Sequence, residues 1–416
     1  MSLRRSALGR ACPWLQGLTA VIALGGVLMP VTKAFALWDE TLKPFVEEKV
    51  TRDDNVFRLS KDLAPEVIGA SSRGDTYRTT SLGFNLDVPV SRQRFQAVFA
   101  RNDTRYDQLT ALNFTGHEGR AVWLWRVGNE VSGQLGYSET FALASFAYIQ
   151  RATPNPLKTQ QAFYNADWLL TPRWRIQSGV IGLEQSNSEP VFQVNDVKIL
   201  ISDIAVSYVT PANTSVGLGV RSEEGRFPNP RGTGFDNAYS QYGANLVAEW
   251  TPTGASRVNA RAGRVSRRYG ELSQRDFDGN TARIDYEWKT TGKFSLTAVA
   301  QRDISVYEDI RTTFVLVKGV TLRPTLRVTE KLDMSGTVEY SIRDYLGDVG
   351  GAGGTPNRTD RVRSAAATLS YRPVRALALQ ISAQREGRSS SVVATPTVFP
   401  VDYVVNAISI AARITF

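Results

Sequence analysis

Arginine is the residue type that offers the most chemistry in this sequence. Of the 49 basic side chains, 39 are arginines, and a guanidinium binds carboxylate, sulfate or phosphate through paired hydrogen bonds while remaining charged. Eight arginines fall on the polar side of segments in which apolar and polar residues alternate: Arg94, Arg126, Arg257, Arg261, Arg283, Arg343, Arg372 and Arg413. Acidic residues share that side, among them Asp87, Glu249, Asp285, Asp303, Asp333 and Glu339.

Residues for catalysis or metal binding are scarce. The only histidine is His117, and the only cysteine is Cys12, close to the N-terminus. A serine–histidine–acid triad would have to use His117 as its base, and no Gly-x-Ser-x-Gly motif supplies the nucleophile. We therefore expect no enzymatic activity, no metal site and no cofactor.

The alternation of apolar and polar residues extends over most of the chain. In 332–343, for example, Leu332 and Met334 fall on one face and Asp333 and Ser335 on the other. Such segments, roughly ten residues or more in length and separated by turn residues, are typical of strands that cross a membrane. Long helical periodicity is absent, so the pattern predicts an all-β fold.

One segment departs from this pattern. Lys318 falls on the apolar face, between Leu316 and Val320. We expect a β-bulge or a misplaced strand end at this point.

The connections between segments alternate in length. Eight are short, for example 89–92 and 171–173, and nine are longer and polar, for example 53–74 and 345–359. Together they join eighteen strands, with both ends of the chain on the short-turn side. Because bacterial outer-membrane barrels have short periplasmic turns and long external loops, we predict a transmembrane antiparallel β-barrel of about 18 strands, with 16 as the alternative.

Aromatic residues recur just before the short turns. They are followed by Pro or Gly turns, and amphipathic aromatic side chains prefer the membrane–water interface. The repeats predict an aromatic girdle at the periplasmic rim, although aromatic residues of strands could also fall there by chance. The five residues are Trp168, Tyr208, Trp250, Trp288 and Tyr371.

The N-terminal residues 1–36 have the features of a secretory signal peptide. Arg4, Arg5 and Arg10 precede a short apolar stretch, and Ala34 and Ala36 form a small-x-small cleavage site. We expect cleavage near Ala36 and a barrel over residues 37–416. The signal segment holds four basic and no acidic residues, so its removal lowers the net charge from +9 to +5.

The last strand ends the chain. Apolar residues alternate with small or polar ones from Ile408 to Phe416, and this ending resembles the C-terminal signature of bacterial outer-membrane barrels. A soluble edge strand with a chance terminal Phe416 is the alternative. The resemblance implies recognition of this strand by the barrel-assembly machinery.

A second resemblance rests on a short motif: Asp53, Asp54, Asn55, Phe57 and Arg58. It resembles the EpsL-type outer-membrane proteins of exopolysaccharide biosynthesis, which are porin-like barrels. Membership would imply a role in the export or assembly of extracellular polysaccharide, with polysaccharide and periplasmic export components as partners. Read from the residues alone, the motif forms a turn after a strand, and its carboxylates could alternatively gather around Ca²⁺.

The inward arginines allow two interpretations. They could form a track along which an acidic glycan slides through a water-filled lumen, or they could pair with the inward acids and stiffen the barrel. Polysaccharide export is the function we expect, with a general or anion-selective diffusion porin as the alternative and a barrel enzyme or surface receptor as the third. The positive charge also suits outer-membrane lipid and lipopolysaccharide, whereas its even spread along strands argues against nucleic acid.

Overall fold

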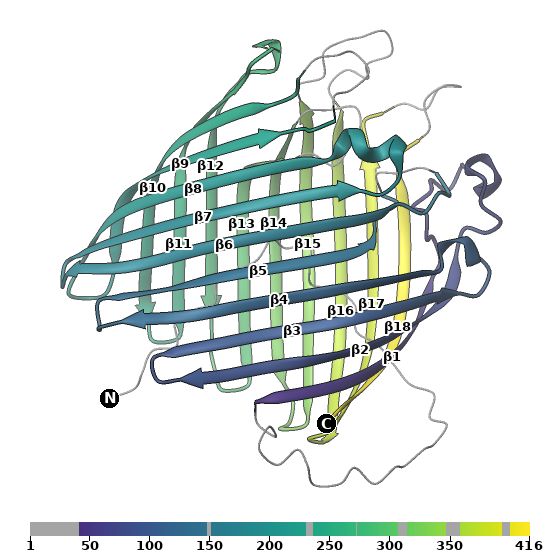
Figure 1. The fold of residues 1–416 in the computed structure, drawn as a ribbon, viewed down its shortest axis with the longest axis horizontal. Coiled ribbons are helices and arrows are strands. Elements are labelled where there is room, and N and C mark those ends of the chain that lie inside the picture. The colour runs from purple at the N-terminus through teal and green to yellow at the C-terminus, as the bar shows by residue number, and fades with distance from the viewer. Residues whose placement is uncertain are drawn as a thin grey trace.

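In the computed structural model, the described residues are 41–147, 151–229, 236–271, 273–306, 314–346, 358–392 and 400–416. The strands among them form one 18-stranded antiparallel sheet that closes into a barrel (Figure 1). Closure is made by the first and last strands: β1 (Leu42–Asp53) pairs with β18 (Tyr403–Thr415) from Phe45↔Thr415 to Asp53↔Ala407. The predicted fold is confirmed, and the strand number is 18 and not 16.

Every other strand pairs with the strands before and after it in the chain. Four 3-10 helices of the described residues lie in the longer connections: η2 (Pro65–Ile68), η3 (Thr110–Leu112), η4 (Pro190–Asn195) and η5 (Ser273–Arg275). The strands between β1 and β18 are β2 (Asp75–Val90), β3 (Gln93–Tyr106), β4 (Phe114–Val127), β5 (Val131–Leu143), β6 (Pro156–Thr171), β7 (Trp174–Asn187), β8 (Val197–Val209), β9 (Ser215–Arg226), β10 (Tyr239–Thr253), β11 (Ser256–Tyr269), β12 (Phe277–Trp288), β13 (Phe294–Val306), β14 (Phe314–Arg327), β15 (Leu332–Leu346), β16 (Thr359–Val374) and β17 (Leu377–Ser390).

Connection lengths distinguish the two ends of the barrel. Every second connection, from the one between β2 and β3 to the one between β16 and β17, is short, and these are the eight predicted turns. The nine predicted loops are the longer connections. The turns lie at one end and the loops at the other (Figure 1). We call these the turn end and the loop end.

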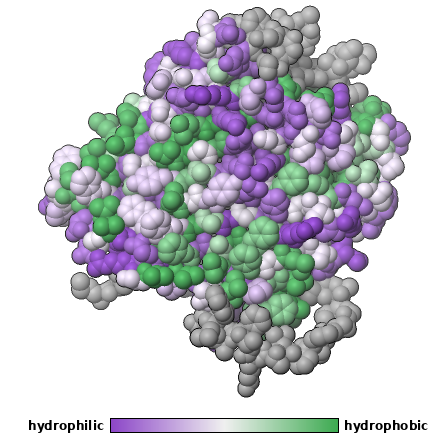
Figure 2. All heavy atoms as spheres, viewed as in Figure 1, coloured by the Kyte–Doolittle hydropathy of each residue, from purple (hydrophilic) through white to green (hydrophobic). Residues whose placement is uncertain are grey.

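The two faces of the sheet differ as the alternation predicts. Large apolar side chains are exposed on the outer face, for example Leu218, Ile381 and Ile408. On the side shown in Figure 2, apolar patches cross the body of the barrel and hydrophilic side chains gather toward the loops. The five aromatics of the predicted girdle are all exposed on this outer face near the turns, with fractions from 39% to 53%.

Lys318 corrects one prediction. The pairing of β14 with both neighbours is regular through this residue, so there is neither a bulge nor a strand end there. The side chain does lie on the outer face, where its Nζ is 2.8 Å from Asp344 Oδ2. The charge is tolerated because it has a carboxylate partner beyond the apolar band.

No helix among the described residues is both long and apolar enough to cross a membrane. Residues 1–40 lie outside the described residues, so the predicted signal peptide and its cleavage near Ala36 stay predictions.

The two faces of β17 provide a test of the membrane-facing surface. Ile381 is on the outer face and 54% exposed, whereas its neighbour Gln380 is on the inner face. Ile381→Arg should destabilise the membrane-inserted barrel by about 2–4 kcal/mol, because a lipid-facing charge is costly near the midplane. Gln380→Arg should change the urea midpoint of unfolding in vesicles little. Equal destabilisation by both variants would contradict this assignment of faces.

Candidate functional site

The inner wall of the barrel carries charges of both signs at close range. Six of the eight predicted arginines have a carboxylate oxygen within 3.2 Å. These pairs are Arg94–Asp87 (2.5 Å), Arg257–Glu249 (2.5 Å), Arg261–Asp303 (3.2 Å), Arg283–Asp285 (2.9 Å), Arg372–Asp333 (2.5 Å) and Arg413–Glu47 (3.2 Å). The arrangement is therefore closer to paired charges than to a bare cationic track.

Glu249 shows how the pairing crosses strands. It lies on β10 and accepts hydrogen bonds from Arg257 on β11 and from Arg175 on β7. Arg175 also lies 3.8 Å from Asp167 on β6. One carboxylate thus connects strands that are not neighbours in the sheet, which stiffens the wall.

Arg267 is a fully buried charge of the lumen that the sequence did not single out. Its side chain has no exposed surface, stacks 3.8 Å from the ring centroid of Tyr239, and donates to Glu223 and Gln241. Arg267 lies six residues after Arg261 on β11, an even spacing that puts both side chains on the inner face. The alternation along the strand could therefore have identified it. The length of the inward stripe on β11 was underestimated.

The remaining two predicted arginines differ from each other. Arg343 on β15 is buried near the loop end. Arg126 on β4 is exposed toward the lumen, and no ion pair of it is found among the described residues. Arg126, Arg94 and Arg261 line one cavity, and the other predicted arginines lie elsewhere on the wall.

That cavity lies inside the barrel and has a volume of about 670 Å³. Its wall is built by strands β2 to β11, near the turn end on β2 to β5 and near the middle of the strands on β8 to β11, and amide side chains contribute much of the polar surface. The larger polar residues of its lining are Arg92, Gln93, Arg94, Arg126, Gln134, Asn165, Asp167, Gln177, Asp203, Arg221, Asn245 and Arg261. Such a wall can hydrogen-bond a hydrophilic solute without offering a strong single binding group.

The loop end is more tightly packed. Phe57 and Leu59 of the β1–β2 connection form a buried cluster with Leu109, Leu112 and other residues of the next two loops. The Phe57 and Phe146 rings meet edge to face, with centroids 4.9 Å apart. No sequence pattern indicates this cluster, because loop residues have no period that reveals what they contact.

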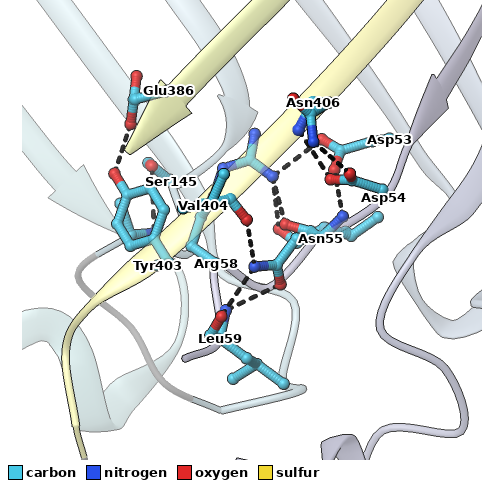
Figure 3. A network of polar contacts seen from close by, with 12 residues as sticks. Asp53, Asp54, Asn55, Arg58, Leu59, Ser145, Glu386, Tyr403, Val404 and Asn406 are labelled. Carbon is cyan, nitrogen blue, oxygen red and sulfur yellow. Dashed lines mark hydrogen bonds and ion pairs between the residues drawn. The ribbon is translucent and has the colours of Figure 1, made fainter. Parts of the chain in front are cut away.

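The motif that begins at Asp53 joins this loop to the seam between β1 and β18 (Figure 3). Asp54 accepts two hydrogen bonds from Asn406 of β18, one from the backbone N–H and one from Nδ2, each 2.7 Å long. Asn55 donates from Nδ2 to the carbonyls of Val404 and Leu59, at 2.9 and 2.8 Å. The seam is therefore extended beyond the last ladder pairs by side chains.

Arg58 completes the motif. Its backbone is left-handed, with φ of 56°, and its guanidinium donates to the Asp53 carboxylate at 2.8 Å and to the Asn55 carbonyl. Burial alone would lower the pKa of Arg58, but the Asp53 carboxylate raises it, so the side chain stays charged. Asp53 and Asp54 point to different partners, and no metal-binding group of three or more His, Cys, Asp or Glu residues is found in the described part of the chain. The motif forms a turn after β1, as one of its two interpretations predicts, and the calcium alternative stays a prediction.

His117 is on the outer face of β4 near the loop end. Its Nε2 lies 2.9 Å from Glu139 Oε1, and its ring stacks on Phe99. No serine is among these contacts. The only histidine is thus placed away from the cavity and outside any triad.

Comparison with known proteins supports a porin-like barrel. Residues 243–410, from β10 to β18, match the family described as "Putative beta-barrel porin 2". No curated protein sequence matches the chain. The match covers less than half of the chain, so it relates this part of the barrel to that family.

Solved outer-membrane proteins have a similar outline. OpdK from Pseudomonas aeruginosa has a TM-score of 0.46 and 12% identity, over 91% of this chain and 100% of its own. OccK2 (OpdF) of the same organism has a TM-score of 0.46 and 11% identity, over 91% of this chain and 98% of its own. OccAB3 from Acinetobacter baumannii has a TM-score of 0.44 and 8% identity, over 90% of this chain and 99% of its own. At these values the likeness is confined to general barrel architecture. The narrower resemblance to EpsL-type proteins stays a prediction.

The seam motif leads to a stability prediction. Asn55→Ala removes three hydrogen bonds to the backbone of Leu59 and Val404. Each buried backbone group left without a partner costs about 1–3 kcal/mol, so the loop should open and limited proteolysis should cleave within 54–74. Lys61→Ala is the control, because the Lys61 side chain is 90% exposed in the same loop. Unchanged cleavage in Asn55→Ala would show that the motif does not hold the loop.

Proposed function

We propose that this chain is a diffusion channel of the bacterial outer membrane for small hydrophilic solutes. The cavity of about 670 Å³ inside a closed barrel carries the proposal. Its amides and ion-paired side chains offer many weak contacts that a passing solute can exchange with water. Weak, multiple contacts favour passage over retention.

The paired lumen charges indicate weak ion selectivity. Because Asp87, Asp303 and other carboxylates neutralise most inward arginines, the lumen has little excess positive charge. Arg92, Arg126 and Arg221 are the less strongly paired cations of the cavity: Arg92 donates to the Gly128 carbonyl, and Arg221 only approaches Glu223 at 3.8 Å. We expect a slight preference for anions.

Polysaccharide export is supported less well than diffusion. A polymer needs a continuous wide path, whereas side chains at the loop end pack into buried clusters in two sectors of the barrel. The similarity of residues 243–410 is to a porin family. Polysaccharide export, with its polysaccharide and periplasmic partners, stays a prediction. Blockade of the single-channel conductance by an added oligosaccharide would test it.

Absence of catalysis is part of the same proposal. The porin-like fold and the outward position of His117 support a channel without enzymatic activity. The surface-receptor alternative has no observation in its favour.

Single-channel conductance of the refolded protein tests the proposal. Asp303→Asn frees Arg261 at the cavity, so the anion-over-cation permeability ratio should rise by roughly two- to fivefold, the effect of about 0.5–1 kcal/mol from one nearby unit charge in water. The reversal potential in a salt gradient measures this ratio.

Asp278→Asn is the matched control. It removes the same charge from the outer face, where Asp278 pairs with Arg268, and should leave selectivity unchanged. No conductance from a protein shown to be folded in the bilayer would overturn the channel proposal. Equal shifts from both variants would show that Arg261 does not face the conducting path.

A further inference from the structure

The outer face of the barrel is asymmetric along its strands. On β16 the outward residues from the turn end are Leu369, Ala367 and Ala365, and these are followed by Arg363 and Arg361. On β17 Ile381 and Ala383 are followed in the same way by Arg385. Outward cations of the described residues thus lie beyond the apolar band, toward the loop end, whereas the aromatic girdle marks the other edge.

Seven of the outward cations on the described strands have an acidic partner on the same face, whereas others, such as Arg101 and Arg264, have none within 4.0 Å among the described residues. Each such pair is close to neutral, so it offers little attraction to a further anion. Examples are Arg105–Asp103 (2.7 Å), Lys198–Glu184 (2.7 Å), Arg268–Asp278 (2.7 Å) and Lys318–Asp344 (2.8 Å).

Arg361, Arg363 and Arg385 have no such partner and lie close together on neighbouring strands, and we call them the arginine triangle. All three are exposed, and none has a carboxylate within 4.0 Å among the described residues. Arg385 donates to the neutral Asn406 side chain at 3.1 Å, and Arg363 lies 5.9 Å from the Tyr340 ring centroid.

The register of β16 and β17 brings the triangle together. Arg363 lies opposite Gly387, which has no side chain, so the diagonal neighbour Arg385 is about 7–8 Å away between Cα atoms. Arg361 lies two residues before Arg363 in the chain and on the same face, closer to the loop end. Long guanidinium side chains at these spacings can converge on one group.

Two outward acids, Asp344 and Asp54, border the triangle, and neither lies within 4.0 Å of its guanidinium groups. Both oxygens of Asp54 accept hydrogen bonds from Asn406. Asp344 on β15 lies one strand away, but its Oδ2 is 2.8 Å from Lys318 Nζ and its Oδ1 accepts from the Thr359 hydroxyl at 3.0 Å. Both of its oxygens are occupied, so three positive charges remain at the edge of the apolar band.

We propose that the arginine triangle binds the phosphate of a phosphorylated glycolipid in the outer leaflet. Guanidinium groups bind phosphate through paired, charge-assisted hydrogen bonds. Acyl chains of the same lipid would lie on the apolar residues below, such as Leu369 and Ile381, which are 40% and 54% exposed. The inference depends on the proposed outer-membrane location with the loop end outward, and it assigns the expected lipopolysaccharide contact to three residues.

Native mass spectrometry of the purified full barrel tests the inference. The probes are diphosphorylated lipid A and its dephosphorylated form, added at equal concentration. The wild type should retain the diphosphorylated lipid, and the triple variant Arg361→Gln, Arg363→Gln, Arg385→Gln should lose affinity roughly tenfold or more, the effect of one or more charge-assisted hydrogen bonds. Arg268→Gln, which changes a paired outward arginine at the same end, should bind as the wild type does.

Three outcomes would overturn the inference: no lipid retained by the wild type, equal binding of the two lipids, or an unaffected triple variant. Displacement by inorganic phosphate at the same concentration as the lipid would indicate a general anion site and would also contradict it. Conductance of the same preparations separates this inference from the channel proposal. A conducting barrel that fails to bind the lipid refutes only the triangle, and a non-conducting barrel with phosphate-dependent binding refutes only the channel.

Discussion

Satisfaction of backbone hydrogen bonds in an apolar environment is the constraint on which this structure depends. A hydrocarbon core supplies no water to pair with exposed N–H and C=O groups, so a sheet can cross it only when no edge is left open. The pairing of β1 with β18 removes both edges at once. The residues that follow Asp53 extend this closure past the ladder, since Asp54 and Asn55 bond to Asn406 and Val404 of the last strand.

Closure determines the chemistry of the lumen. Because one face of every strand contacts lipid, the polar side chains of all eighteen strands point into the enclosed interior. Charges in such confinement are costly unless paired, and the pairs found here join strands that are distant in sequence, as Arg175 and Glu249 do. The same pairing that stabilises the wall also reduces its net field, which is why a weakly selective channel fits the lumen better than a cationic track.

The outer face follows a different rule, because its charges meet lipid headgroups and solvent. Outward cations of the described strands lie beyond the apolar band, and carboxylates accompany about half of them. At the β16–β17 edge this compensation is missing, and the arginine triangle is left with neutral or aromatic neighbours. Successive residues of one strand point to opposite faces, so one strand can contact a solute on the inside and a lipid on the outside.

The sequence by itself determined the properties that depend on local periodicity. Alternation assigned Leu332 and Asp333 to opposite faces, and the lengths of the connections indicated eighteen strands and the two ends of the barrel. These succeed because the strand period and the turn signals act over a few neighbouring residues. Only the tertiary structure decided which charges meet: the partner of Arg261, the burial of Arg267, the regular register at Lys318 and the loop cluster around Phe57 all depend on strand register and loop packing. Those contacts join residues far apart in the chain, and no local pattern encodes the distance between them.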